Sequence, residues 1–248
     1  MTSKDYEGTL RMPKKSWIRD KTGQLQVRIS QFADRVNSHP AKILSSLIID
    51  GESTVCFDGQ YFFDTDHVSK NSGSQSNDIS VDISEVDAPT HGTTTAPSSG
   101  EFARAIMQSV QTIYGLKDDE GEPTNQMAKS FAVMVPVPYM SAALEATTSL
   151  LGANGGSNLL PSLQSRGTIK LEVIINPRLS WTTKFATFRT DGAVKPFVLL
   201  EDEGMRDVFA LGPESEYCRV NGHCLAGVDW SGAVQYGDWT QAVLTTLT

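Results

Sequence analysis

The first candidates for chemistry are Asp64, Asp66 and His67, which place two carboxylates and an imidazole within four residues. Such a group could act in general acid–base catalysis or supply part of a metal site. The alternative is a polar turn that follows an aromatic strand, and this is the interpretation we favour. We therefore predict that the chain has no catalytic residue and is not an enzyme, and keep a site near Asp64, Asp66 and His67 as an alternative.

A second candidate group lies near the C-terminus, where Cys218, His223 and Cys224 are close in sequence. They lack paired Cys-x-x-Cys spacing and a nearby fourth ligand, so we predict no metal site. With Cys56 the chain has three cysteines, and this small, odd number favours reduced, buried thiols over a disulfide framework. The sequence has no glycine-rich phosphate loop after a strand and no Gly-x-Ser-x-Gly motif, so we predict no cofactor.

The composition is that of a globular protein. With 248 residues, 39% of them hydrophobic and 20% charged, the chain is long enough for a core and unlike collagen, a coiled coil or a disordered protein. No apolar run approaches the roughly 18 residues that span a bilayer, and the N-terminus lacks the apolar segment of a signal peptide. We therefore expect a protein made in a cytoplasm, with no membrane partner.

Charge is distributed unevenly along the chain. Residues 1–50 hold nine Lys and Arg against five Asp and Glu, whereas residues 51–248 hold twelve against twenty-four. An acidic body argues against a dedicated DNA-binding protein, which needs clustered basic residues. A basic arm on one copy could pair with the acidic body of another copy. The alternative is that the basic excess is only a solvated surface without a partner. The candidate subunit contacts are Arg11, Lys14, Lys15, Trp17 and Arg19.

Hydrophobic spacing predicts a pair of helices separated by a short break. Leu25, Ile29, Phe32 and Val36 recur at spacings of four, three and four, which predicts a helix from Gln24 to about Ser38. Pro40 disfavours helical geometry at the preceding residue and suits the first turn of a second helix, which we expect to end around residues 50–51.

Two further helices have clear starting signals. Ser98 and Glu101 have the spacing of a capping box, which predicts a helix to Gly115 that buries Phe102, Ile106, Val110 and Ile113. Pro138 is expected to open a helix that runs through Leu151. Its predicted inward residues are Met140, Leu144, Thr147 and Leu151.

The remaining pattern favours strands, so we predict an α+β protein. Residues 4–12 alternate loosely, as one arm of a hairpin would. The polar segment 69–100 reads as an exposed loop with one short strand at residues 79–83. Residues 131–137 and 168–175 are expected to be strands. From residue 181 we expect a mostly antiparallel sheet, with turns at 191–192, 221–222 and 231–232.

Five segments of the sequence occur in an order that resembles one protein family. They are residues 56–67 (CFDGQYFFDTDH) with the preceding LIIDG at 47–51, residues 133–138 (VMVPVP), 174–179 (IINPRL), 227–232 (GVDWSG) and 235–241 (QYGDWTQ). Over roughly residues 12–248 the chain resembles the major head subunit family of Mu-like phages, also called the major capsid protein or T protein.

The resemblance implies the HK-97-like fold of tailed-phage capsid proteins. Residues 23–51, with the spine helix, and residues 206–231 would form the peripheral domain. Residues 52–205 and 232–248 would form the axial domain, with 69–100 as an exposed polar loop. Residues 1–22 would be the remnant of an extended loop or N-terminal arm. Family members ordinarily carry several dozen residues before the position of Met12, so we expect a shortened chain or a variant without the arm.

The function that the resemblance implies is structural. The chain would assemble with itself into hexamers, pentamers and an icosahedral shell that encloses double-stranded DNA without reading its sequence. Its other partners would be a scaffold or protease, a portal and decoration proteins, and its location the virion capsid, assembled in the bacterial cytoplasm. An encapsulin-like cellular compartment is an alternative, because a fold alone does not decide function.

Overall fold

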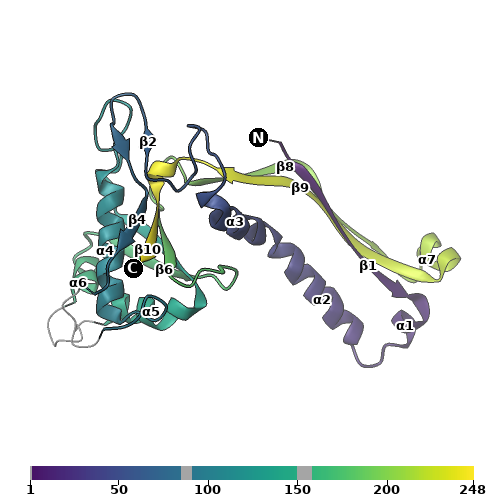
Figure 1. Cartoon of the computed structure of the whole chain (residues 1–248). Helices are drawn as coiled ribbons and strands as arrows, with labels where there is room; N and C mark the ends of the chain where they lie inside the picture. The colour runs from purple at the N-terminus through teal and green to yellow at the C-terminus, as the bar shows by residue number, and fades with distance from the viewer. Residues whose placement is uncertain (1, 85–90, 150–157) are drawn as a thin grey trace. The chain divides into compact units, whose positions relative to one another are not determined.

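A computed structural model describes residues 2–84, 91–149 and 158–248 and divides the chain into two compact units (Figure 1). Unit 1 comprises Met1–Leu44 and Leu199–Gln235, and unit 2 comprises Ser45–Val198 and Tyr236–Thr248. Within the described part of the chain, no helix combines the length and the apolar character needed to cross a bilayer.

Unit 1 contains a three-stranded sheet in the order β1 (Lys4–Pro13), β9 (His223–Tyr236) and β8 (Phe197–Leu211). β1 runs antiparallel to β9, with a register from Lys4 opposite Gly232 to Pro13 opposite His223. The strand predicted at residues 4–12 is confirmed. Its expected place in a local hairpin is wrong, because its partner comes from the other end of the sequence.

Two short helices lie at one end of the β1–β9 pair, as Figure 1 shows. α1 (Lys14–Arg19) follows β1 directly, and α7 (Glu216–Asn221) connects β8 to β9. The amide of Lys14 donates a hydrogen bond of 2.9 Å to the carbonyl of Gly222, which ends α7 in the left-handed conformation, with φ of 68°. This bond joins the N-terminal segment to the turn between β8 and β9.

The predicted helix pair is confirmed as α2 (Gln24–Asn37) and α3 (His39–Ile49), separated by Ser38. The predicted stripe of α2 is the less exposed side of the helix, yet its members, Leu25, Ile29, Phe32 and Val36, are only half-buried. No residue of α2 is fully buried. An amphipathic helix normally buries its apolar stripe, so the packing of α2 within one chain is incomplete.

Unit 2 contains a five-stranded mixed sheet. Its order is β4 (Asp78–Val81), β10 (Ala242–Leu247), β7 (Lys184–Arg189), β5 (Ser130–Val135) and β6 (Lys170–Ile175). β10 pairs in parallel with β4, and β5 pairs in parallel with β6, while β7 runs antiparallel to both of its neighbours. A separate small sheet joins β2 (His67–Val68) to β3 (Ser74–Gln75). Short 3-10 helices occupy Asp50–Glu52, Val137–Tyr139 and Trp239–Gln241.

One face of this sheet is covered by α4 (Ser99–Gly115), which contacts β10, β7 and α5 (Met140–Thr148). α6 (Leu159–Ser165) packs beside α5 and β6. The capping box predicted for α4 is present: Ser98 accepts from the Glu101 amide at 3.4 Å, and Glu101 accepts from the Ser98 amide at 2.7 Å. The four predicted inward residues of α4 are all buried. Phe102 packs on Phe185 of β7, with ring centroids 4.8 Å apart.

An aromatic cluster packs on the face of β7 opposite to α4. Phe188 packs on Phe197 at 5.4 Å, and Phe197 packs on Phe62 at 5.2 Å. Phe62 in turn stacks on Tyr236 at 4.6 Å. Because neighbouring side chains of a strand point to opposite faces, Phe185 and Phe188 bury β7 on both sides.

Several expectations are wrong, each for a local reason. Met140 and Leu144 of α5 are 45% and 38% exposed, because the helix packs through the small residues Ala142, Ala143 and Ala146. Leu151 lies outside the described residues. Residues 221–222 end a helix instead of forming a two-residue hairpin, since Asn-Gly also suits a helix C-terminus. Residues 231–232 continue β9 without a turn.

The polar segment 69–100 is less exposed than expected. Its predicted short strand is confirmed as β4, at the edge of the five-stranded sheet. Ser72, Asn77, Val81 and Ile83 are buried, so an exposed loop is the wrong description of residues 72–83. Residues 85–90 lie outside the described part.

The capping box gives a first prediction. Replacing Ser98 by Ala removes the side-chain acceptor of the Glu101 amide and should lower the free energy of unfolding by about 1 kcal/mol. Denaturant unfolding followed by circular dichroism measures this change. Ser99→Ala, the same substitution one residue into the helix, is the control, and equal effects of the two variants would contradict the assigned cap.

Candidate functional site

The suspected catalytic histidine, His67, is a buried structural residue. It has no exposed surface, and its Nδ1 lies 2.6 Å from Oδ2 of Asp58, which is not in the candidate group. Its ring stacks on Trp239 with centroids 4.0 Å apart. Nε2 is buried and has no hydrogen-bond partner among residues 2–84, 91–149 and 158–248. A ring enclosed in this way cannot reach a substrate from solvent.

Asp58 is the residue that organises this segment. Its Oδ1 accepts hydrogen bonds from the Cys56 thiol and from the Gln60 amide, both at 3.1 Å. Burial alone would raise the pKa of Asp58, but the hydrogen bonds from Cys56, His67 and Gln60 outweigh it and hold this pKa below its usual value. Asp58 is therefore a carboxylate at neutral pH, paired with His67.

Cys56 does not have the properties of a nucleophile. Burial, with the neighbouring Asp58 carboxylate, raises the pKa of Cys56 to about 12, so the thiol is protonated at neutral pH. The reactive species in cysteine catalysis is the thiolate. Cys56, Asp58 and His67 thus form a hydrogen-bonded structural cluster.

Asp64 and Asn77 connect this cluster to the sheet. The carboxylate of Asp64 accepts the amides of Tyr61 at 3.2 Å and Thr65 at 2.7 Å, while Asp66 is exposed. Asn77, which has no exposed surface, donates to the carbonyls of Phe62 at 2.8 Å and Trp239 at 3.3 Å. The sequence does not single out Asn77, because it lies in a polar run without periodicity. The Asp-Gly pair at 58–59, a common turn signal, is the sequence feature that could have identified Asp58.

Cys218 and Cys224 form a disulfide, so the expectation of reduced thiols is wrong for this pair, while Cys56 is free. The two cysteines bracket α7, and Cys224 faces Met12 across the β1–β9 pair. Among the described residues, no group of three or more His, Cys, Asp or Glu could hold a metal ion.

The residues predicted as subunit contacts lie at the end of β1 and on α1. Arg11 is exposed, with Nη2 3.3 Å from Nδ1 of His223. Lys15 and Arg19 are exposed, whereas Lys14 and Trp17 are half-buried, and no residue of α1 is fully buried. The neighbouring Ile18 is 65% exposed. This surface can make both charged and apolar contacts.

Comparison with known proteins gives one family match, over the first part of the chain. Residues 1–90 match the family model "Mu-like prophage major head subunit gpT", which confirms for this part the resemblance found in the sequence. A comparison with curated proteins found no match.

Three solved structures have a similar fold. The capsid of Myoviridae phage XM1 matches with a TM-score of 0.55 and 10% identity, over 99% of this chain and 74% of that chain. The capsid of a native GTA particle matches with a TM-score of 0.54 and 11% identity, over 99% and 73%. The bacteriophage JBD30 capsid matches with a TM-score of 0.54 and 16% identity, over 72% and 75%. The expected α+β capsid fold of the HK-97-like type is confirmed.

A second prediction concerns Asp58. Asp58→Asn should lower the free energy of unfolding at pH 7 by about 2 kcal/mol, the range for hydrogen bonds to a charged group. The folded-state pKa of Asp58 lies below the unfolded value of about 3.9. Its stabilisation is therefore complete above that value and is lost as the pH falls through the folded pKa. Unfolding curves between pH 7 and pH 2 should show the two proteins converging in acid.

The exposed Asp66 provides the control for this experiment. Asp66→Asn should leave the free energy of unfolding within about 0.5 kcal/mol of the wild type, as surface substitutions usually do. An Asp58→Asn protein as stable as the Asp66→Asn protein at pH 7 would contradict the assigned role of Asp58.

A third prediction concerns the disulfide. Reduction of Cys218–Cys224, or its replacement in the Cys218→Ser, Cys224→Ser double variant, should lower the free energy of unfolding by about 2 kcal/mol, the value for a short closed loop. Thermal unfolding with and without a reductant measures this. The double variant should not respond to the reductant, and an equal response of both proteins would refute the prediction.

Proposed function

We propose that this chain is a major capsid protein of a tailed phage or prophage that assembles with itself into an icosahedral shell around double-stranded DNA. The observation that carries the proposal is the agreement between two independent comparisons. The match of residues 1–90 to the Mu-like major head subunit concerns sequence, and the match of 99% of the chain to the phage XM1 capsid concerns fold.

In this proposal the two units have different places in the shell. Unit 1, with α2, α3 and the long strands β8 and β9, is the peripheral domain, and β1 is the returning strand of an extended loop. Unit 2, with its five-stranded sheet, is the axial domain at the centre of each ring of subunits. The division of the chain into two compact units supports this assignment.

The basic surface at the end of β1 and on α1 is proposed to contact the acidic body of a neighbouring copy. A ring of identical subunits requires two different surfaces of the chain to be complementary. Arg11, Lys14, Lys15 and Arg19 supply positive charge, and Trp17 with Ile18 supplies apolar area. Each exposed ion pair contributes only about 0 to 1 kcal/mol, so stability comes from repetition over many subunits.

The acidic body also suits a wall that encloses DNA without binding it strongly, because phosphate binding requires clustered basic residues.

We propose that the chain catalyses no reaction, that its shells form in the bacterial cytoplasm, and that a scaffold or protease, a portal and decoration proteins take part. The enclosed position of His67 and the raised pKa of Cys56 support the non-enzymatic function.

Electron microscopy of the purified chain tests the proposal. Rings, shells or tubes of regular size are expected at high protein concentration in negative stain. A chain that stays monomeric at every protein and salt concentration would overturn the proposed function.

A fourth prediction concerns the basic surface. The Lys14→Glu, Lys15→Glu double variant should form few rings or shells at about 0.1 M salt, where charges are screened beyond roughly 10 Å. Sedimentation and negative-stain counting measure assembly. Lys129→Glu, Lys170→Glu makes the same charge change at two exposed positions of unit 2 and is the control. Equal assembly of the two variants would contradict the proposed role of this surface.

A further inference from the structure

The segment that resembles the Mu-like head subunit presents an exposed aromatic side chain on a tight turn. Phe57 is 72% exposed, and Val55 and Tyr61, which pair in an antiparallel bridge on either side of the turn, are 56% and 44% exposed. We call residues 55–61 the hairpin knob. Single exposed apolar residues are common, but an exposed cluster with an aromatic residue at its tip is typical of an interaction site.

The knob is held in one conformation before any partner binds. Cys56 donates its amide to the carbonyl of Gln60 at 2.7 Å, and Gly59 closes the turn with a φ of 93°, which disfavours other residues. The carboxylate of Asp58 accepts from Cys56, Gln60 and His67. A preformed contact loses less conformational entropy on binding than a mobile one.

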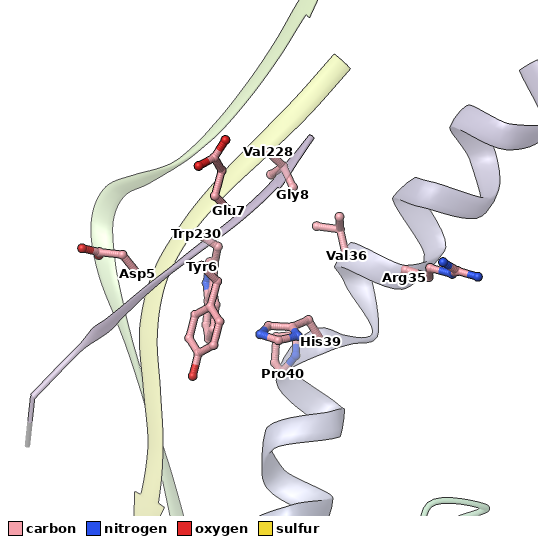
Figure 2. A pocket seen from close by; sticks show the side chains of 10 residues that line it. All are labelled: Asp5, Tyr6, Glu7, Gly8, Arg35, Val36, His39, Pro40, Val228 and Trp230. Carbon is pink, nitrogen blue, oxygen red and sulfur yellow. The ribbon is translucent and has the colours of Figure 1, made fainter. Parts of the chain in front are cut away.

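Unit 1 contains a pocket with aromatic walls that can accept such a side chain. It has a volume of about 370 Å³ and is lined by Tyr6 and Val228 from the strands and by Val36 and Pro40 from the helices. The Tyr6 ring stacks on Trp230 at 5.3 Å, and His39 meets both rings edge-on (Figure 2). A cavity of roughly 150 Å³ with apolar walls binds benzene, so this pocket has room for one benzyl group.

The charged side chains around the pocket point away from it, and His39, whose Nε2 is buried without a hydrogen-bond partner among the described residues, is a polar member of the lining. Figure 2 shows Asp5 and Glu7 pointing away from the Tyr6 side of β1, and the guanidinium of Arg35 pointing away from the strands. The exposure of Asp5 and Glu7 and the half-burial of Tyr6 agree with this alternation.

The charges around the pocket differ between its two sides: Asp5 and Glu7 lie on the strand side, whereas the helix side is basic. Residues 50–69, which contain the knob, hold five Asp and Glu and no Lys or Arg. The helices beside the pocket, α2 and α3, hold Arg28, Arg35 and Lys42 against the single acidic Asp34. Because complementary charge fixes orientation, the acidic segment that carries the knob would face the helix side of the pocket and not the strand side.

We propose that the hairpin knob of one copy inserts Phe57 into the Tyr6–Trp230 pocket of a second copy. The contact joins two different surfaces of the same chain, as a ring or shell requires. It rests on the proposed capsid function and deepens it, because it names a pair of surfaces that subunits use. Asp58 and His67 are positioning residues in this contact, since they fix the turn that presents Phe57.

A matched pair of variants tests the proposal. Phe57→Ala should weaken self-association at least about tenfold, as loss of an interface anchor does, and Phe57→Leu should recover most of it. Met127, which is 73% exposed outside the knob, gives the control Met127→Ala, which should associate like the wild type. Analytical ultracentrifugation measures association, and thermal unfolding should show all three variants as stable as the wild type.

Photo-crosslinking locates the contact. With p-benzoylphenylalanine at position 57, irradiation of the assembled protein should yield a covalent dimer whose linked peptide contains Tyr6, Val36, His39 or Trp230. A crosslink within one chain, or one to any other surface of the second copy, overturns the contact. If the wild type and Phe57→Ala assemble equally well, the Phe57 contact is overturned and the proposed capsid function is not. If the wild type never assembles, both are overturned.

Discussion

The hairpin of unit 2 depends on one half-buried carboxylate. Asp58 accepts hydrogen bonds from Cys56, Gln60 and His67 and so closes the turn. The residue before Asp58 is exposed, and two aromatic residues after the turn are buried. Phe57 points to solvent, whereas Phe62 and Phe63 are buried in the aromatic cluster beside β7. Hydrogen bonds to a charged group contribute about 1.5 to 3 kcal/mol, so the three donors and the carboxylate stabilise one another. The same motif that suggested catalysis is thus a structural support.

Unit 1 depends instead on a pairing between the two ends of the sequence. β1 adds to β9 over its whole length, and the disulfide and the Lys14–Gly222 hydrogen bond fix the end where α1 begins. The sheet and α2 do not bury each other completely, and two cavities that share Val36 and Val228 remain between them. An incompletely buried apolar stripe leaves apolar surface available for contact with another protein surface.

In the proposed assembly, charged contacts and apolar contacts have different roles. Exposed ion pairs are weak and depend on salt, but they orient approaching subunits over distances of about 10 Å. Aromatic anchors that enter a preformed pocket act only at contact and supply most of the binding free energy. The chain carries charged features, a basic first fifth and an acidic remainder, and apolar features, an exposed aromatic turn in unit 2 and an apolar pocket in unit 1.

The sequence by itself determined the features that depend on neighbouring residues. The capping box at Ser98 and the stripes of α2 and α4 repeat every three or four residues, so the helices and the buried side of α4 could be predicted. The family resemblance, which rests on short motifs in order, gave the fold class. Only the tertiary structure decided which strands pair, because the partner of β1 lies at the other end of the chain and no local pattern encodes that contact. It also decided that His67 is enclosed by Trp239 and paired with Asp58, that Met140 is exposed, and that Cys218 meets Cys224. Each of these depends on which side chains meet in three dimensions, whether they are close in sequence, as Cys218 and Cys224 are, or distant, as His67 and Trp239 are.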